Sequence, residues 1–205
     1  MLQVTAKDAL LVVDVQNDFC SGGALAVPEG ERVVRVINCM QKAFDHIVFS
    51  RDWHPDEHCS FSYSPEYKDG SWPTHCVQDT PGAEFHGDLR IPVDALIVDK
   101  AVTPEKDAYS AFEGTGLAAK LRGRRVERVF VTGLALDYCV RATALDALKE
   151  GFSVLLVQDA VRAVNPANTT EVLKNLEEAG VTAAAIEQSV REQYAAQFIH
   201  EKEDA

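Results

Sequence analysis

The sequence predicts an α/β protein built on an open, doubly wound parallel sheet of about six strands, with helices on both faces. Two observations predict this fold class. Short apolar runs alternate with longer amphipathic stretches, as in repeated strand–helix units. The runs are nearly continuous in apolar residues, as expected of strands buried on both faces of a sheet. The 205 residues suit a single domain, which we place over residues 1–205.

The expected elements follow one another along the chain. Ala9–Val15 is the first and most apolar strand, and residues 29–44 carry apolar side chains at helical spacing. The further expected strands are His46–Arg51, Ala95–Val98, Arg128–Leu134, Ser153–Val157 and Thr182–Ile186. The further expected helices are Leu117–Leu121, Cys139–Glu150, Thr169–Ala179 and the tail from about Val190.

One stretch, at about residues 52–92, breaks the alternation. It is rich in Pro, Gly, Ser, His and aromatic residues, and a loop of this length is usually functional or disordered. Both Trp residues and four of the six His residues fall within it, which speaks against disorder. We expect a loop that carries metal and substrate contacts.

Composition excludes several classes of partner. The net charge of −12 argues against nucleic acid and against an anionic membrane surface, since both attract clustered Lys and Arg. We expect no signal peptide and no membrane span. The five cysteines are odd in number and show no framework spacing, so we expect free thiols and a cytoplasmic location.

Reactive side chains follow four of the expected strands. Asp14 closes the first strand, Asp52 and His54 follow the second, Lys100 follows the third, and Cys139 comes just after the fourth. Ligands of doubly wound sheets bind beyond the carboxyl ends of the strands. We therefore expect these groups to meet at one edge of the sheet.

Cys139 is a candidate nucleophile because it opens a helix. The positive end of the helix dipole favours a thiolate, and the backbone N–H groups there can bind an oxyanion. Asp14 is poorly solvated at the end of an apolar strand, so it is a candidate base, and the Lys100 ammonium would stabilise both anions. The alternatives are an inert buried cysteine and a plain internal ion pair.

The Asp52-Trp53-His54 segment, with His58 and His75 downstream, is a candidate metal site. In an extended segment the two ligands of an Asp-x-His pair share one face, and carboxylate with imidazole suits zinc, iron or manganese. The alternative is a His-rich surface loop. Aromatic surface near these groups would come from Phe19, Trp53, Trp72 and Tyr109, although Trp53 is as well explained by core packing.

Five segments together resemble the nicotinamidase/pyrazinamidase family of isochorismatase-like cysteine hydrolases: LLVVDVQNDFCSGGALAV, SRDWHPDEHCSF, SWPTHCVQDTPGAEFH, IVDKAVTPEKDAYSAF and GLALDYCVRATALDA. The resemblance spans the chain from Leu10 to about Ser189. It implies a three-layer isochorismatase-like fold. It also implies a small-molecule substrate, nicotinamide and by extension pyrazinamide, which is deamidated through a thioester in the salvage of NAD breakdown products.

The resemblance also implies roles for individual residues. The implied catalytic triad is Asp14, Lys100 and Cys139, and the implied ligands of one divalent metal ion are Asp52, His54 and His75. In some members a further His, which His58 resembles, is a fourth ligand, whereas in others water fills that place. The implied pocket walls are Phe19, Trp72, Leu25 and Tyr109. The Leu134–Ala135 bond resembles one that is cis in the family, with the Ala135 and Cys139 N–H groups as oxyanion hole.

Two other functions stay open. Another hydrolase of the same superfamily, such as an N-carbamoyl amide amidase, a ureidoacrylate amidohydrolase or an isochorismatase, would share the Asp and Lys positions but generally lacks the metal set. A non-catalytic metal-binding protein on the same fold is the second, and retention of the whole triad argues against it. Members of the family range from monomers to homo-oligomers, and spacing does not choose between them.

Overall fold

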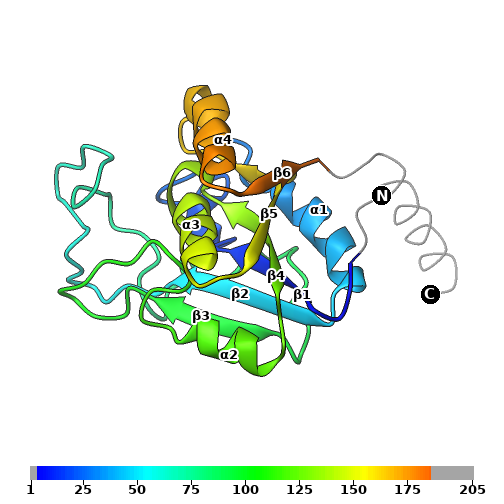
Figure 1. Cartoon of the computed structure of the whole chain (residues 1–205). Coiled ribbons are helices and arrows are strands. Elements are labelled where there is room, and N and C mark those ends of the chain that lie inside the picture. The colour runs from blue at the N-terminus through cyan, green and yellow to red at the C-terminus, as the bar shows by residue number, and fades with distance from the viewer. Residues whose placement is uncertain (1–3, 186–205) are drawn as a thin grey trace, which may run out of the picture.

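A computed structural model describes residues 4–185 of the chain. Its centre is one sheet of six parallel strands in the order β3-β2-β1-β4-β5-β6 (Figure 1). The strands are β1 (Asp8–Val13), β2 (His46–Asp52), β3 (Leu96–Lys100), β4 (Arg128–Leu134), β5 (Ser153–Arg162) and β6 (Thr182–Ala184). The predicted fold class is confirmed, and each strand overlaps an expected one.

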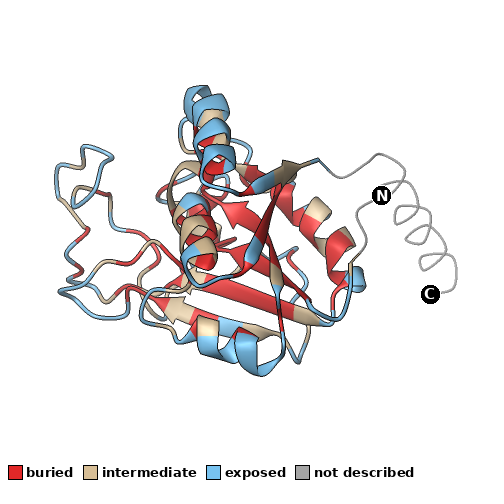
Figure 2. Ribbon diagram, in the orientation of Figure 1, coloured by how far each residue is buried: buried red, intermediate tan, exposed pale blue. Residues whose placement is uncertain are grey.

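Helices cover both faces of the sheet, as expected. They are α1 (Arg32–Met40), α2 (Leu117–Gly123), α3 (Arg141–Lys149) and α4 (Thr169–Glu178). Leu10 and Val12 of β1 pack in one cluster with α1, whereas Leu11 and Val13 pack in a second with α2, α3 and α4. The strands are consequently buried between two layers (Figure 2). None of the helices within residues 4–185 is long and apolar enough to cross a bilayer.

Two expected helices begin or end differently. The segment at residues 29–44 forms α1 and then a short 3-10 turn, Gln41–Ala43. The helix expected from Cys139 starts earlier, as a wide π turn, η3 (Leu136–Val140), before α3. The tail expected to be helical from Val190 lies outside the described residues.

The strand order reverses between β1 and β4. From β1 the chain builds outward to β2 and β3, and from β4 it builds the other way to β5 and β6. This reversal is where open α/β sheets bind their ligands. Gly133 lets β4 end close to β1, because its φ is 107° and a Cβ there would lie 2.0 Å from the Val13 carbonyl oxygen.

The segment between β2 and β3 contains neither helix nor regular strand in its described backbone. Isolated bridges hold it, including His54 with Val77 and Phe61 with Trp72. It extends away from the sheet and returns (Figure 1). Part of it covers the α1 side of the sheet, where Trp72 and Leu89 join the apolar cluster. The expected functional loop is thus an ordered chain segment, not a disordered one.

Candidate active site

Four side chains meet beyond the carboxyl ends of the strands. Asp14 follows β1 directly, Asp52 closes β2, Lys100 closes β3, and Cys139 lies in η3 after β4. Asp52 and Lys100 are paired residues of neighbouring strands. All four residues are buried. The structure therefore brings together the groups that the sequence placed at one sheet edge.

Lys100 is the centre of this cluster. It is 1% exposed, and its ammonium donates hydrogen bonds to Asp52 Oδ1, to the Ala108 carbonyl at 3.1 Å and to Cys139 Sγ at 3.4 Å. Its Nζ lies 2.9 Å from Asp14 Oδ2. Burial alone would lower the pKa of Lys100, but the two carboxylates outweigh burial and raise it well above its usual value. The ammonium is therefore a permanent charge.

Asp14 has two unequal carboxylate oxygens. Its Oδ1 accepts a hydrogen bond from Ser50 Oγ at 2.7 Å. Within residues 4–185, its Oδ2 is the one fully buried side-chain oxygen or nitrogen that has no hydrogen bond. Burial raises the pKa of Asp14, the Asp52 charge adds to this, and Lys100 offsets only part of it. Oδ2 is therefore well suited to accept a proton.

Cys139 lies beside the Asp14 carboxylate, since its Sγ and one carboxylate oxygen of Asp14 are within 4.8 Å of each other. Burial raises the pKa of Cys139 well above its usual value, and the Asp14 and Asp52 charges add to this while Lys100 opposes it. The helix start was expected to favour the thiolate, and burial opposes that effect. Desolvation and two carboxylates dominate here, so the thiol keeps its proton until a base removes it.

The backbone at Cys139 departs from a regular helix. The Ala135 carbonyl accepts hydrogen bonds from the N–H groups of Tyr138 and Val140, whereas in an α-helix it would accept the one from Cys139. The wide turn thus leaves the Cys139 N–H for another acceptor. The Leu134–Ala135 peptide bond is cis, as the resemblance implied. An oxyanion hole formed by the N–H groups of Ala135 and Cys139 stays a prediction.

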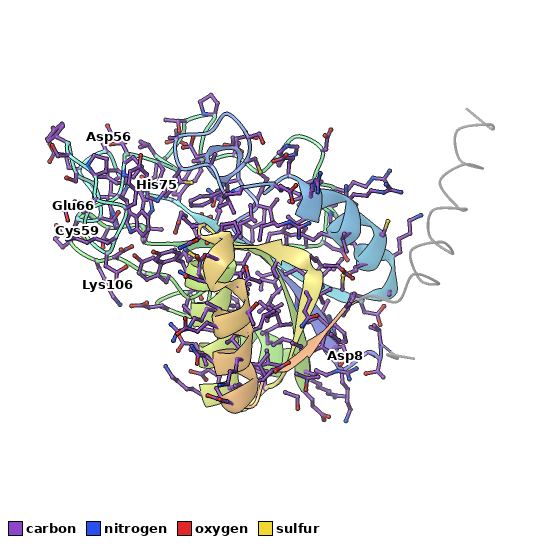
Figure 3. The ribbon with its side chains drawn as sticks, turned by 90° about the horizontal axis from the view of Figure 1, so that it is seen from above. Asp8, Asp56, Cys59, Glu66, His75 and Lys106 are labelled. Atoms are coloured by element: carbon purple, nitrogen blue, oxygen red, sulfur yellow. The ribbon has the colours of Figure 1, made fainter. Side chains whose placement is uncertain are left out.

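Asp52, His54 and His75 form a second group beside the first. Their candidate ligand atoms all lie within 4.8 Å of one another, and all three residues are buried. The Nδ1 atom of His54 lies 3.3 Å from the Ala101 carbonyl, and that of His75 lies 2.7 Å from the Pro73 carbonyl. Such carbonyl contacts at Nδ1 fix the imidazoles and leave each Nε2 as the ligand atom. Figure 3 shows His75 at the base of the projecting loop.

This donor set fits a divalent transition metal. Burial lowers the pKa of His75, with His54 adding to the effect and Asp52 opposing it, so the ring is neutral as a ligand must be. Lys100 and His54 outweigh the burial of Asp52 and lower the pKa of this carboxyl, so it is an anion. Two imidazoles and one carboxylate are a common set for zinc and iron.

Asp52 connects the two groups. Its Oδ1 accepts the hydrogen bond from Lys100, and its Oδ2 lies 3.7 Å from His54 Nε2. Gln16 fixes the backbone of Asp52, because its side chain accepts from the Asp52 N–H at 2.9 Å and donates to the Asp52 carbonyl at 2.8 Å. One strand-end residue thereby serves both the lysine and the metal ligands.

His58 does not join the three ligands in this structure. Its ring stacks on that of His54 with centroids 4.2 Å apart, its Nδ1 lies 2.7 Å from Ser60 Oγ, and its Nε2 lies 3.2 Å from the Lys106 carbonyl. A fourth-ligand role would require His58 to give up one of these contacts. That role stays a prediction.

A pocket opens onto both groups. Its lining includes Phe19, Leu25, Trp72, Tyr109, His75 and Cys139. Trp72 Nε1 donates to Tyr109 Oη at 3.0 Å, and that hydroxyl donates to Asp69 Oδ1 at 2.7 Å. The four expected aromatic and apolar walls are thus in one place. Trp53 is not among the lining residues, and the Arg51 guanidinium lies over its ring at 3.7 Å.

Comparison with known proteins assigns the chain to a family. The family model described as the isochorismatase domain matches residues 8–188. The chain belongs to the isochorismatase family. One relative, the nicotinamidase of Escherichia coli, is 41% identical to this chain over 197 residues, which cover 85% of this chain and 92% of that protein. The nicotinamidase/pyrazinamidase of Mycobacterium tuberculosis is 42% identical over 182 residues, covering 84% and 96%.

Solved structures of the family agree with the fold. A crystal structure of the pyrazinamidase of Pyrococcus horikoshii in complex with zinc matches with a TM-score of 0.80 and 48% identity, covering 88% of this chain and 99% of that one. A crystal structure of a protein from L. infantum in complex with nicotinate matches with a TM-score of 0.82 and 39% identity, covering 90% and 96%.

The sequence did not indicate every residue at this isochorismatase-family site. Ser50 and Gln16 are polar residues at the ends of apolar runs, and that contrast could have marked them. Tyr138 lines the pocket and packs edge-on against Trp72 with ring centroids 5.0 Å apart, and its place beside Cys139 was the available signal. Asp107 also lines the pocket, from a segment without any pattern.

Proposed function

We propose that the chain is a nicotinamidase in which Cys139 attacks the carboxamide of nicotinamide, giving nicotinate and ammonia, and that it acts on pyrazinamide in the same way. The observation that carries this proposal is the meeting of the Cys139 thiol and the Asp52, His54 and His75 donors in one aromatic-walled pocket. Several relatives are nicotinamidases by name, and one structural neighbour holds nicotinate, which supports the choice of substrate.

The first half of the reaction forms the thioester. Asp14 Oδ2 accepts the proton of Cys139 Sγ, and the sulfur bonds to the carboxamide carbon. The negative charge that develops on the carboxamide oxygen is held by the N–H groups of Ala135 and Cys139. The Lys100 ammonium, which lies 3.4 Å from Cys139 Sγ, stabilises the negative charge that the sulfur carries once Asp14 has taken its proton.

The second half releases the products. The carbon–nitrogen bond breaks as protonated Asp14 returns the proton to the leaving nitrogen, which departs as ammonia. Asp14 then takes a proton from water, the water oxygen bonds to the thioester carbon, and the carbon–sulfur bond breaks. Nicotinate leaves, and the proton returns to Cys139, so the enzyme is restored.

Asp52, His54 and His75 would hold one divalent ion, which supplies a Lewis acid to the pocket that can anchor the pyridine nitrogen. We assign zinc as this ion, and the zinc complex of the related pyrazinamidase supports the assignment. Phe19 and Trp72 would flank the ring, with Leu25 and Tyr109 completing the wall. All five cysteines are free, which fits a single-domain protein in the reducing cytoplasm.

The test is a direct assay of purified protein loaded with zinc. Nicotinamide should yield equal amounts of ammonia and nicotinate, measured by an enzyme-coupled ammonia assay and by chromatography. Ureidoacrylate and an N-carbamoyl amide, offered at the same concentration, should be poor substrates. Absence of turnover on nicotinamide and pyrazinamide would refute the proposal, and metal analysis of the same sample would show whether iron or manganese replaces zinc.

A further inference from the structure

Ser50 is a buried hydroxyl to which the reaction described above gives no role. It lies in β2 opposite Val13 of β1 and is 1% exposed. A hydroxyl at such a position costs stability unless it is hydrogen-bonded. Its one proton is donated to Asp14 Oδ1 at 2.7 Å. The side chain is therefore committed to the residue that acts as the base.

Ser50 also holds the main chain of Asp14. The Asp14 N–H donates to the Ser50 carbonyl at 3.1 Å, at the point where the chain leaves β1 with a φ of 49° at Asp14. Rotation of a carboxylate about its terminal torsion is only weakly restricted by the side chain itself. A hydrogen bond to one oxygen therefore selects where the other oxygen points.

The two carboxylate oxygens of Asp14 differ in their hydrogen bonding. Oδ1 is held by Ser50, while Oδ2 has no hydrogen bond and lies 2.9 Å from Lys100 Nζ. Cys139 Sγ lies within 4.8 Å of a carboxylate oxygen of Asp14 and 3.4 Å from the same Nζ. In enzymes with an activated nucleophile, the base is commonly oriented by a third group. Here that third group is a hydroxyl on the neighbouring strand.

We infer that Ser50 is a positioning residue, whose hydroxyl holds Asp14 Oδ1 so that Oδ2 faces the thiol of Cys139. The inference rests on the proposed function, because it takes Asp14 to be the base. Ser50 itself touches neither substrate nor metal. Its loss should slow the proton transfer from Cys139 and leave substrate binding intact.

The decisive comparison is between Ser50→Val and Ser50→Thr. The two side chains have nearly the same shape, and only threonine keeps the hydroxyl. Ser50→Ala removes the hydroxyl without adding volume, so it covers the case in which the larger side chains do not fit. Thr132→Val is a matched control, because Thr132 is a fully buried hydroxyl of β4 that donates to the Leu11 carbonyl at 2.9 Å.

We expect Ser50→Ala and Ser50→Val to lower kcat for nicotinamide by about 10- to 100-fold, the range seen when a group that orients an active residue is removed. KM and zinc content should stay close to their wild-type values. The melting temperature should not fall further than it does in Thr132→Val. Ser50→Thr should stay within about 3-fold of wild type. Unchanged kcat in Ser50→Ala, a Thr variant as slow as the Val variant, or an equal loss in Thr132→Val would overturn the inference.

A second measurement separates this inference from the substrate assignment. Alkylation of Cys139 by iodoacetate, located by mass spectrometry, requires the same loss of the thiol proton but involves no carboxamide. Alkylation should be slower in Ser50→Val than in Ser50→Thr, and equal rates would count against Ser50. If the two variants are alkylated in this order but the wild-type protein does not turn over nicotinamide, only the proposed function is contradicted.

Discussion

Strand β1 carries a buried aspartate at each end, and the two are held in opposite ways. At its start, Asp8 accepts hydrogen bonds from Arg128 on both oxygens and from the backbone and hydroxyl of Thr5. Just past its end, Asp14 has one oxygen bonded to Ser50 and one with no hydrogen bond. Figure 3 shows Asp8 far from His75, which marks the carboxyl end of the sheet.

The pKa values follow this difference. Burial alone would raise the pKa of Asp8, but the bonds from Arg128 and Thr5 hold it below its usual value. Burial raises the pKa of Asp14, and Lys100 does not fully compensate. A fully bonded carboxylate stabilises the fold, whereas an incompletely bonded one retains a free lone pair for chemistry. The amino end of the sheet is therefore built for stability and the carboxyl end for reaction.

The largest expected effect is that of Cys139→Ala at the carboxyl end. The variant should lower kcat for nicotinamide by at least about 10⁴-fold, since no other group supplies the nucleophile. Its melting temperature should stay close to that of wild type, because the variant loses one buried sulfur atom and keeps the Asp14–Lys100 ion pair. Ammonia release and thermal unfolding measure the two quantities. Cys20→Ala, a buried cysteine that does not line the pocket, is the control and should retain activity.

His75→Ala tests whether the carboxyl end depends on the loop as well as on the strands. Loss of one of three ligands should empty the metal site and reduce kcat/KM by roughly 100-fold or more. Metal analysis and ammonia release give the two readouts. His86→Ala, in the same loop but outside the ligand group, should keep both metal and activity. Full activity in metal-free His75→Ala would mean that the residues at the strand ends hydrolyse the amide without a ligand from the loop.

Asp8→Asn tests the amino end. The variant should lose about 1–3 kcal/mol of unfolding free energy at pH 7 and keep its specific activity. Because the pKa of Asp8 is lowered by folding, its contribution is fully present above the unfolded pKa of about 4 and is lost as the pH falls through the folded value. The difference from wild type should therefore shrink from pH 5 to pH 2 in urea unfolding.

The matched control for Asp8 is Glu127→Gln, which breaks an exposed ion pair with Lys7 at the same end of the sheet. Such a pair contributes little, so the change should be below about 0.5 kcal/mol. A loss of activity in folded Asp8→Asn, or an equal loss of stability in Glu127→Gln, would contradict the division between the two ends.

Periodicity predicted the sheet better than the exact ends of its strands. The apolar run at Ala9–Val15 continues past the strand, because Val15 is buried although the backbone has already turned at Asp14. Conversely, β5 continues to Arg162, beyond the last residue of the apolar run, since polar Gln158 and Asp159 sit in the strand half-buried. Hydrophobicity indicates which residues are buried, but a buried residue need not lie in a strand, and a strand residue need not be apolar.

The strand-end residues of the site were predictable from the sequence, because parallel strands end at the same edge. The choice between His58 and His75 as the third ligand was not, since no periodic pattern places a residue in the middle of a long loop, and only the family resemblance favoured His75. The pKa of Cys139 could not be read from its helix start alone, because burial and two carboxylates from other strands set it. Contacts between distant segments decide such quantities.

Tyr109→Phe should produce the smallest effect, and it tests what Trp72 of the β2–β3 loop adds to the pocket wall, because Tyr109 follows β3 and its hydroxyl fixes Trp72. The Tyr109 hydroxyl accepts from Trp72 Nε1 and donates to Asp69, and Trp72 is 4% exposed. Without the hydroxyl the indole N–H is left unpaired, and the ring loses the contact that fixes its plane against the substrate. We expect KM for nicotinamide to rise by about 3- to 10-fold with kcat unchanged, since the hydrogen bonds to Trp72 and Asp69 are lost while the groups at the strand ends are untouched.

Steady-state kinetics on nicotinamide and titration with nicotinate measure this change. Tyr63→Phe is the control, because Tyr63 lies in the segment between β2 and β3, as Trp72 does, and is fully exposed. A fall in kcat at constant KM would mean that Tyr109 acts on the reacting carboxamide, and the loop would then belong with the strand ends as part of the chemistry. A rise in KM alone places the loop in a different role: it holds the ring, while the buried, incompletely bonded groups at the strand ends do the bond-breaking.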